Sequence, residues 1–408
     1  MHAVAGPILS LLSGVALLMV GGGALGSLIG LRLAGDAAGT LTVGLVTAAF
    51  FAGLTAGSLY GYRVVLRVGH IRAFSAFASI LSAATLAHAL AADPALWAAL
   101  RLSEGFCMAG LYMCIESWLN DTATNETRGR VLSLYMVTLY GATAAGQQLL
   151  NLDDSGTTPF LVISILLSLA LVPVALTRTA PPGLPDVASF GLGRLYRASP
   201  LGVAGVFVSG VITGGVYGLA PVFGALSGFG VAETALFMTV LILGGVALQW
   251  PLGRLSDLFD RRAVLIGLST ALVVASFAMI EAAGRDRALA LGVAAVFGGL
   301  SFTLYPVSLA HTVDHVGKAD LVSASGGLIL ANSMGAVLGP LCASAAMAAV
   351  GPEGLFAFAG TAAFAATLYG LWRMRMRPPV PAEEQCIFCP VPQTTPVAAP
   401  LPVRAGKA

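Results

Sequence analysis

Residues Gly253–Arg262 read GRLSDLFDRR and stand between two apolar runs, Ala235–Leu252 before and Ala263–Ile280 after. Two aspartates and three arginines therefore fall within ten residues of an otherwise apolar part of the chain. Runs of about 18 or more apolar residues are typical of helices that cross a membrane. The stretch is predicted to be a short turn at a membrane surface that joins two spanning helices.

The composition extends this prediction to the whole chain. Of the 408 residues, 57% are hydrophobic and 10% are charged, whereas soluble domains carry about 25% charged residues. The 50 glycines suit helices that approach closely in lipid, where small residues lie at helix contacts. The chain is therefore predicted to be an all-α polytopic protein whose partners are the lipid bilayer and a small molecule. Its net charge of +2 does not indicate a nucleic-acid partner.

Turn residues and charges interrupt the apolar pattern at intervals that predict twelve spanning helices. The longest interior interruption is rich in proline and separates six spans from six. The predicted parts are an N-terminal bundle (1–178), a linker (179–198), a C-terminal bundle (199–372) and a disordered tail (373–408). The predicted spans are 8–33, 39–62, 71–92, 95–118, 129–151, 159–177, 199–224, 232–252, 263–283, 287–310, 319–348 and 353–372.

Lysine and arginine in the loops predict the orientation, because these residues favour the cytoplasmic side. Fifteen lie on the side of the linker, and three lie on the opposite side. Both termini and the linker are therefore predicted to be cytoplasmic. The chain is also expected to lie in the inner membrane and to be a monomer. The fifteen are Arg63, Arg67, Arg72, Arg128, Arg130, Arg178, Arg194, Arg197, Arg254, Arg261, Arg262, Lys318, Arg373, Arg375 and Arg377, and the three are Arg32, Arg285 and Arg287.

The two predicted bundles repeat one another in sequence. Glycines four residues apart keep one helix face bare, so that another helix or a substrate can come close. Parallel repeats place a substrate path between the halves, near the midplane of the bilayer. The matching pairs are Gly22 and Gly210, Gly26 and Gly214, and Gly30 and Gly218, 188 residues apart, and Tyr112 and Tyr305, and Gly146 and Gly339, 193 residues apart.

Few charges lie within the predicted spans, and each costs about 2.5–3.5 kcal/mol to insert, which makes it a functional candidate. Arg101 and Glu104 are three residues apart and hence on one helix face. They are predicted either to line the cavity as a proton- or substrate-responsive pair or to form a structural pair. Glu116, near the inner end of the same span, is a candidate proton carrier or a structural latch to Arg128 or Arg130.

Two further groups of polar residues are candidates for the transport path. His311 and Asp314 end the tenth span, where they are predicted either to sense or pass protons or to form a solvated loop edge. Uncharged polar groups in spans are costly to bury unless they are hydrogen-bonded. The uncharged polar residues of the second group are therefore predicted to be hydrogen-bonding groups of the cavity or links between helices. This second group is Gln147, Gln148, Tyr217, Tyr305 and Asn332.

The sequence contains no nucleotide-binding glycine loop, no set of metal ligands and no nucleophile–base arrangement. The one CxxC, Cys386 and Cys389, supplies only half of a zinc site. We therefore expect neither an enzyme nor an ATP-driven pump, and no cofactor or metal. An ion gradient, expected to be of protons, is the remaining common source of energy.

The opening stretch resembles the major facilitator superfamily, and the resemblance extends over residues 8–372. The family's loop signature, roughly GxxxDxxxRR, is nearly complete as Gly253, Asp257, Arg261 and Arg262. The family's fourth-span pattern, an arginine with a glycine four residues on, matches Arg101 and Gly105. Two strings are similar to the YcaD-like branch, namely IESWLND at Ile115–Asp121 and QWPLGRLSD at Gln249–Asp257.

The resemblance implies two six-helix bundles that rock around a central site and open it to alternate faces. It also implies that Asp257 latches the cytoplasmic side against the start of the fifth span, near Thr127–Gly129, and against an arginine of the opposite bundle. A carboxylate at a helix N-terminus meets a partial positive charge, which agrees with this role. In the first half Gly61 stands where the aspartate belongs, so the gate is predicted to be asymmetric.

Together these features predict a secondary active transporter of a small molecule that is coupled to protons. One alternative is a proton-driven efflux pump for amphipathic drugs, and another is a non-transporting membrane sensor or scaffold. The resemblance weakens the efflux interpretation, because Gly141 to Gln147 lack the glycine–proline pair common in drug/proton antiporters. The glycine-rich, weakly charged spans favour a neutral or amphipathic substrate.

Overall fold

The computed structural model describes most of the chain, and what is described is helical. The described ranges are 2–35, 39–124, 126–152, 156–176, 191–317 and 320–376, with 378, 380, 381, 385, 386, 388 and 392–395 of the tail. Among these residues, eleven helical stretches are long and apolar enough to cross a membrane, α6 and α7 counting as one. The remaining predicted span is α5 with η1, which lies against α1 and α10.

The first half of the chain forms α1 (His2–Gly35), α2 (Thr40–Val68), α3 (His70–Leu90), α4 (Pro94–Thr122), α5 (Arg128–Gly146), the 3-10 helix η1 (Gln147–Leu152), α6 (Thr158–Leu169) and α7 (Leu171–Ala175). The second half forms α8 (Leu192–Ala198), α9 (Pro200–Leu226), α10 (Val231–Leu258), α11 (Arg261–Ala283), α12 (Arg287–Val313), α13 (Leu321–Val350) and α14 (Gly354–Met374). Each of the twelve predicted spans falls on one helix or on two consecutive ones, which confirms the predicted fold class. Of the predicted linker, 179–190 lies outside the described residues.

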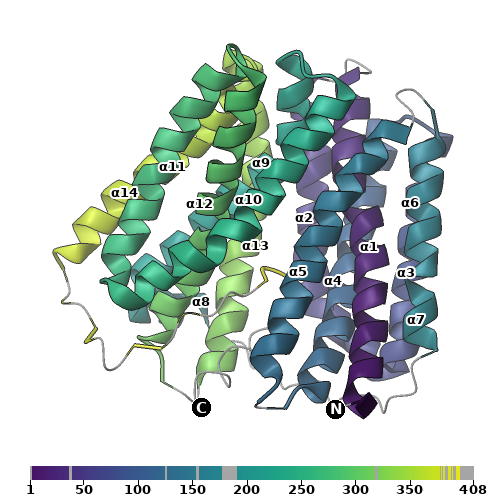
Figure 1. Cartoon of the computed structure of the whole chain (residues 1–408), viewed down its shortest axis with the longest axis horizontal. Coiled ribbons are helices and arrows are strands. Elements are labelled where there is room, and N and C mark those ends of the chain that lie inside the picture. Colours follow the sequence, from purple (N-terminus) through teal and green to yellow (C-terminus); the bar gives the residue numbers. More distant parts are fainter. Residues whose placement is uncertain are drawn as a thin grey trace.

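Figure 1 shows the two halves side by side, with α1–α7 on the right and α9–α14 on the left. We call the face at which α1 begins and α14 ends the terminal face, and the opposite one the far face. Aspartates in the loops begin several helices. Asp93 accepts from the Leu96 amide at 2.7 Å, Asp260 from the Arg262 amide at 3.0 Å, and Asp286 from the Ala288 amide at 2.7 Å. Such caps satisfy amides that a helix N-terminus leaves without partners.

Glycines set the closest helix contacts, and both halves use them in the same way. A Cβ added at Gly105 of α4 would lie 2.7 Å from the Leu54 amide nitrogen of α2. Gly298 lies 193 residues later in α12 and meets the backbone of α10 at Leu241 in the same manner. Gly146 and Gly339, also 193 apart, face the backbone of α1 and α9, respectively. The internal repeat seen in the sequence is therefore also a repeat of helix packing.

The repeat corrects the predicted location of the missing aspartate. Gly53 of α2 and Gly244 of α10 both lie against the backbone of the paired helix, and they are 191 residues apart (244 − 53). The same offset places the counterpart of Asp257 at Leu66 (257 − 191), so the prediction of Gly61 was wrong by five residues. The first-half copy still carries no carboxylate at that position.

The two bundles meet in the half of the molecule near the far face. Thr40 at the start of α2 donates to the Ser344 carbonyl of α13 at 3.3 Å. Gln148 of η1 donates to Thr239 of α10 at 2.9 Å, and Thr239 donates to the Ala144 carbonyl at 3.1 Å. The far face is therefore held closed by contacts between the bundles.

Candidate functional site

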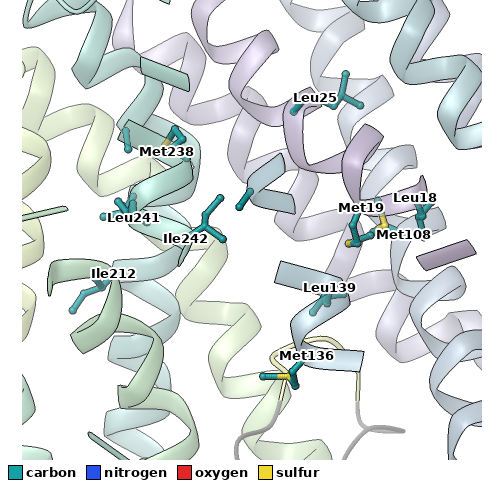
Figure 2. Packing of buried hydrophobic residues seen from close by; sticks show 14 of the residues in the cluster. Leu18, Met19, Leu25, Met108, Met136, Leu139, Ile212, Met238, Leu241 and Ile242 are labelled. Atoms are coloured by element: carbon teal, nitrogen blue, oxygen red, sulfur yellow. The ribbon is translucent and has the colours of Figure 1, made fainter. Parts of the chain in front are cut away.

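A cavity of about 230 Å³ lies between the two bundles. One wall comes from α1, α2, α4 and α5, and the other comes from α9, α10, α12 and α13. Figure 2 shows Met19 beside Met108 on the first wall and Met238 on the opposite side, and all three side chains line the cavity. The predicted site residues that line it are Arg101, Gln147, Tyr217 and Asn332.

Arg101 is the charged side chain that lines the cavity. Its Nη1 donates to Glu104 Oε2 at 2.8 Å, and its guanidinium carbon lies 4.0 Å from the centre of the Phe50 ring. Glu104 is fully buried behind it. A guanidinium over an aromatic face gains further stabilisation when both groups are shielded from water. The pair predicted from the sequence is therefore formed, and only its cationic member reaches the cavity.

His88 of α3 extends this pair into the first bundle. Its Nδ1 lies 2.8 Å from the Ala84 carbonyl and 3.4 Å from Glu104 Oε1. Its ring stacks on Phe160 and contacts the edge of Trp97. Among the described residues, His88 Nε2 and Glu104 Oε1 have no hydrogen-bond partner. Arg101, Glu104 and His88 thus form a row of titratable groups, which we call the buried row, from the cavity into the bundle.

His88 was not predicted as a site residue, because a histidine in an apolar run has no neighbour in sequence that suggests its role. The signal was still present, since an ionisable residue inside a span is a functional candidate by default. Its partner Glu104 is evident only in the fold, where α3 and α4 lie side by side.

The second half has no counterpart of the buried row. At the repeat offset of 193, Ala294 and Phe297 occupy the positions of Arg101 and Glu104, and both are fully buried. Gly105 and its counterpart Gly298 nevertheless make the same helix contact. The charges of the buried row are therefore not needed to pack this helix against its neighbour.

The uncharged candidates lie in two places, at the cavity and in the contact between the bundles near the far face. Gln147 lines the cavity but also links helices, since its Oε1 accepts from Ser27 at 2.7 Å and its Nε2 donates to the Gly23 carbonyl at 2.7 Å. Asn332 likewise donates to the Val206 carbonyl at 3.1 Å. Gln148 lies instead in the far-face contact described above. Gln147 and Asn332 therefore line the cavity and also form hydrogen bonds to other helices.

Aromatic rings connect the bundles across the cavity. The Phe302 ring of α12 lies 5.4 Å from the Tyr140 ring of α5 and 5.6 Å from the Tyr217 ring of α9, centre to centre. Tyr305, also predicted for the cavity, does not line it. It is fully buried, and among the described residues its hydroxyl has no hydrogen-bond partner.

The charged loop at Gly253–Arg262 forms an ion-pair network on the terminal face. Arg261 is buried and binds Asp257 at 3.1 Å and Asp314 at 2.6 Å. We call Asp257, Arg261 and Asp314 the gate cluster. The structure thus places Asp314 in this cluster and not in the cavity. His311 is also buried away from the cavity lining, with its ring 4.6 Å from that of His315.

Two further arginines near this face are buried. Arg262 binds Asp260 at 2.7 Å. Burial acts to raise the pKa of Asp260, but the hydrogen bonds and charge of Arg262 outweigh it and hold that pKa below the ordinary value. Arg128 is buried and donates to the Ala123 carbonyl at 3.3 Å, whereas Arg130 is exposed.

Glu116 is fully buried and accepts from the Tyr135 hydroxyl at 3.0 Å. It also accepts from Thr394 and Thr395 of the tail. Asp257 in turn accepts from the Phe388 amide at 2.8 Å. None of the described hydrogen bonds or ion pairs of Asp257 reaches the start of α5, which is the contact that the family resemblance implies.

The described residues contain no group of three or more His, Cys, Asp or Glu side chains that could hold a metal ion. Cys386 lies at the terminal face, and Cys389 of the predicted CxxC lies outside the described residues.

Comparison with known proteins agrees with this arrangement of helices. A family model of the Major Facilitator Superfamily matches residues 11–299 and 228–387. The uncharacterised MFS-type transporter YcaD of Escherichia coli O6:K15:H31 (strain 536 / UPEC) is 32% identical over 337 residues, which cover 82% of this chain and 87% of YcaD.

Two solved structures share the fold at low sequence identity. The nucleoside transporter NupG superposes with a TM-score of 0.78 and 10% identity, over 91% of this chain and 100% of NupG. A bacterial homolog of the human lysosomal transporter Spinster, in an inward-facing and unoccupied conformation, superposes with a TM-score of 0.70 and 17% identity. That match covers 99% of this chain and 97% of the Spinster homolog.

Proposed function

Because the chain belongs to the Major Facilitator Superfamily and is similar to YcaD, we propose that it is a secondary active transporter that is coupled to protons. It moves a small molecule by alternating access, as a monomer in the cytoplasmic membrane. The observation that carries the proposal is the cavity between the bundles, which holds the charged end of the buried row. We assign the terminal face, where the gate cluster lies, to the cytoplasm because its loops carry the excess of basic residues.

The geometry supports an inward-facing state. The bundles touch near the far face, while the residues of the gate cluster pair within their own bundle or with the tail. In the opposite state the bundles close at the terminal face, and Asp257 then reaches the N-terminus of α5. A carboxylate stabilises a helix N-terminus by about 0.3–1 kcal/mol at an exposed site, which is enough to bias two states of similar free energy.

The buried row supplies the coupling. In its charged form Glu104 neutralises Arg101. Without this partner, the guanidinium would be an uncompensated cation in a low-dielectric interior. When Glu104 takes up a proton, with His88 beside its second oxygen, it no longer neutralises the guanidinium. Arg101 can then donate to an acceptor group of the substrate in the cavity. Proton and substrate binding are linked in this way through one side chain.

The lining indicates a substrate with an apolar or aromatic part and a hydrogen-bonding part. Phe302, Tyr140 and Tyr217 present ring surfaces, while Gln147 and Asn332 present amides. Ligand sites of this kind combine mostly apolar walls with a few placed polar groups. We infer a small neutral or amphipathic molecule with at least one acceptor for Arg101.

Efflux of amphipathic drugs is the second candidate. Met19, Met108 and Met238 line the cavity, and methionine adapts its shape to varied apolar ligands. A thermal-shift screen with metabolites and amphipathic cations separates the candidates, because a ligand that binds only the folded protein raises its apparent stability. Stabilisation by many unrelated amphipathic cations would favour efflux, and stabilisation by one metabolite class would favour the leading proposal.

Flux in proteoliposomes under an imposed pH gradient tests the coupling, with a substrate identified by that screen. Glu104→Gln keeps the size of the side chain and an oxygen that can accept from Arg101, but it cannot take up a proton. We expect this variant to lose stimulation by the gradient while it retains substrate exchange at equal pH. Gradient-stimulated flux of wild-type size in Glu104→Gln would refute Glu104 as the coupling group.

Asp257→Asn is expected to shift the population toward the state that is open at the terminal face. The variant lacks the negative charge that stabilises the closed terminal face at the start of α5. Cysteines placed on that face should react faster with a maleimide, and cysteines at the far face more slowly. Asp260→Asn is the matched control, because it neutralises a neighbouring aspartate that forms an ion pair with Arg262. Equal reactivity in the two variants would contradict the latch.

A further inference from the structure

The tail does not lie free of the helices. Its described residues run from the end of α14 across the terminal face and lie between the two bundles, beside α13 and α5 in Figure 1. Disorder was predicted for 373–408 because this tail is short and rich in proline. The described residues between 385 and 395 have hydrogen-bond partners among the polar groups of both bundles.

On the C-terminal bundle, the tail binds the gate cluster. The Cys386 amide donates to Asp314 at 2.9 Å, and the Phe388 amide donates to Asp257 at 2.8 Å. Arg261 donates to the Cys386 carbonyl. Backbone groups of the tail thus contact each of the three charged residues that define the cluster.

The Phe388 side chain is seated on the same loop. It is buried, with 8% of its surface exposed, and its ring lies where a Cβ at Gly253 would be. Gly253 is therefore needed here for the close approach of an aromatic ring as well as for its place in the loop signature. An apolar side chain and two amides hold the tail on one bundle.

On the N-terminal bundle, the tail binds Glu116. The hydroxyls of Thr394 and Thr395 donate one to each carboxylate oxygen, and both threonines are buried. Hydrogen bonds to an ionised carboxylate are stronger than those between neutral groups. Gln393 and Thr394 also line the cavity. The tail therefore forms part of the cavity wall on the side of the terminal face.

We propose that the tail, through its described residues 385, 386, 388 and 392–395, is an autoinhibitory segment that occupies a binding site between the bundles at the terminal face. The segment spans from Asp257 on one bundle to Glu116 on the other, and alternating access requires these bundles to approach each other at this face. It must leave before the face can close, and while bound it narrows the entrance to the cavity. Its release is thus a step that limits transport.

The proposal is tested on purified protein, without any transported substrate, by the reactivity of a cysteine in the cavity. Ser333 lines the cavity. The variant Ser333→Cys is made in a protein whose five native cysteines are replaced by serine or alanine. A bulky maleimide is then added to the full-length chain, to a chain that ends at Met376 and to a chain that ends at Pro396. The chain that ends at Pro396 is the matched control, since it keeps every contact described above.

We expect the chain that ends at Met376 to react about tenfold faster, which corresponds to about 1.4 kcal/mol in the release equilibrium. The control should react like the full-length chain. A synthetic peptide of residues 383–396 added to the shorter chain should slow the reaction again. Equal rates in the full-length chain and the chain that ends at Met376 would overturn the proposal.

A point-variant pair keeps the test independent of truncation. Thr394→Glu with Thr395→Glu places carboxylates against Glu116, and like charges in one buried site repel. This variant should react as fast as the chain that ends at Met376. Thr394→Ser with Thr395→Ser retains both hydroxyl donors and should react like wild type. A glutamate variant that reacts no faster than the serine variant would contradict the binding of the tail to Glu116, whether or not the protein proves to be a transporter.

Discussion

Arg101→Ala is expected to abolish proton-coupled flux and to destabilise the protein. Glu104 is fully buried and bonded to Arg101 at 2.8 Å. Removal of one partner of a buried ion pair leaves an uncompensated charge and costs about 3–5 kcal/mol. Thermal unfolding and flux in proteoliposomes measure the two effects separately. Flux of wild-type size under a pH gradient in Arg101→Ala would end the coupling assignment.

A double variant separates the structural role of the pair from the functional one. Arg101→Met with Glu104→Met removes both charges and fills the space with apolar atoms of similar size. Such replacements are often neutral or stabilising by about 1–4 kcal/mol, so we expect stability close to that of wild type. Ala294 and Phe297 already show that the equivalent helix pair packs without charges. Gradient-driven flux should remain lost, and its recovery would mean that the pair is structural.

Gly105→Ala is expected to cause the second large effect, a loss of folded protein. The added Cβ would lie 2.7 Å from the Leu54 amide nitrogen, and the nearest atoms all belong to the backbone of α2, which cannot move aside as a side chain can. Overpacking typically costs about 1–3 kcal/mol, occasionally more. Here it also separates two helices that form a wall of the cavity. The yield of monodisperse protein and its unfolding temperature measure the effect.

Gly141→Ala is the matched control within a neighbouring helix. Apart from the nearby backbone of its own helix, no atom of the described residues lies within 4 Å of the position of its Cβ, and alanine favours a helix over glycine by about 1 kcal/mol. We expect unchanged or slightly higher stability. If both alanine variants behaved alike, the close contact of α4 with α2 would not determine the stability of this bundle.

The ends of the helices show where sequence patterns reach their limit. The second span was predicted to end at residue 62, but α2 continues to Val68. The span was predicted to end before the first basic residue, whereas the helix continues with Arg63 and Arg67 exposed. Long basic side chains can keep their charged ends in water while the helix continues. Periodicity therefore predicts the lipid-facing length of a helix better than its true length.

The site was found in part, for a similar reason. A charge inside a span is evident in the sequence, and Arg101 and Glu104 were recognised on that basis. His88 and the seat of Phe388 on Gly253 depend on helices and tail residues that are far apart in the chain. His311 and Asp314 were predicted either to sense or pass protons or to form a solvated loop edge, and the structure groups Asp314 with Arg261 in the gate cluster.

By itself, the sequence determined the membrane-spanning fold, the repeat of two six-helix halves, the family and the few charged residues within the spans. These features are local or periodic in the sequence. The free energy of transferring side chains between water and lipid makes them costly to change. Only the tertiary structure decided which face is closed, that Glu104 faces His88, and that the tail joins Asp257 to Glu116. These contacts join residues distant in sequence, and they exist only because packed helices and a buried carboxylate require partners that no local pattern specifies.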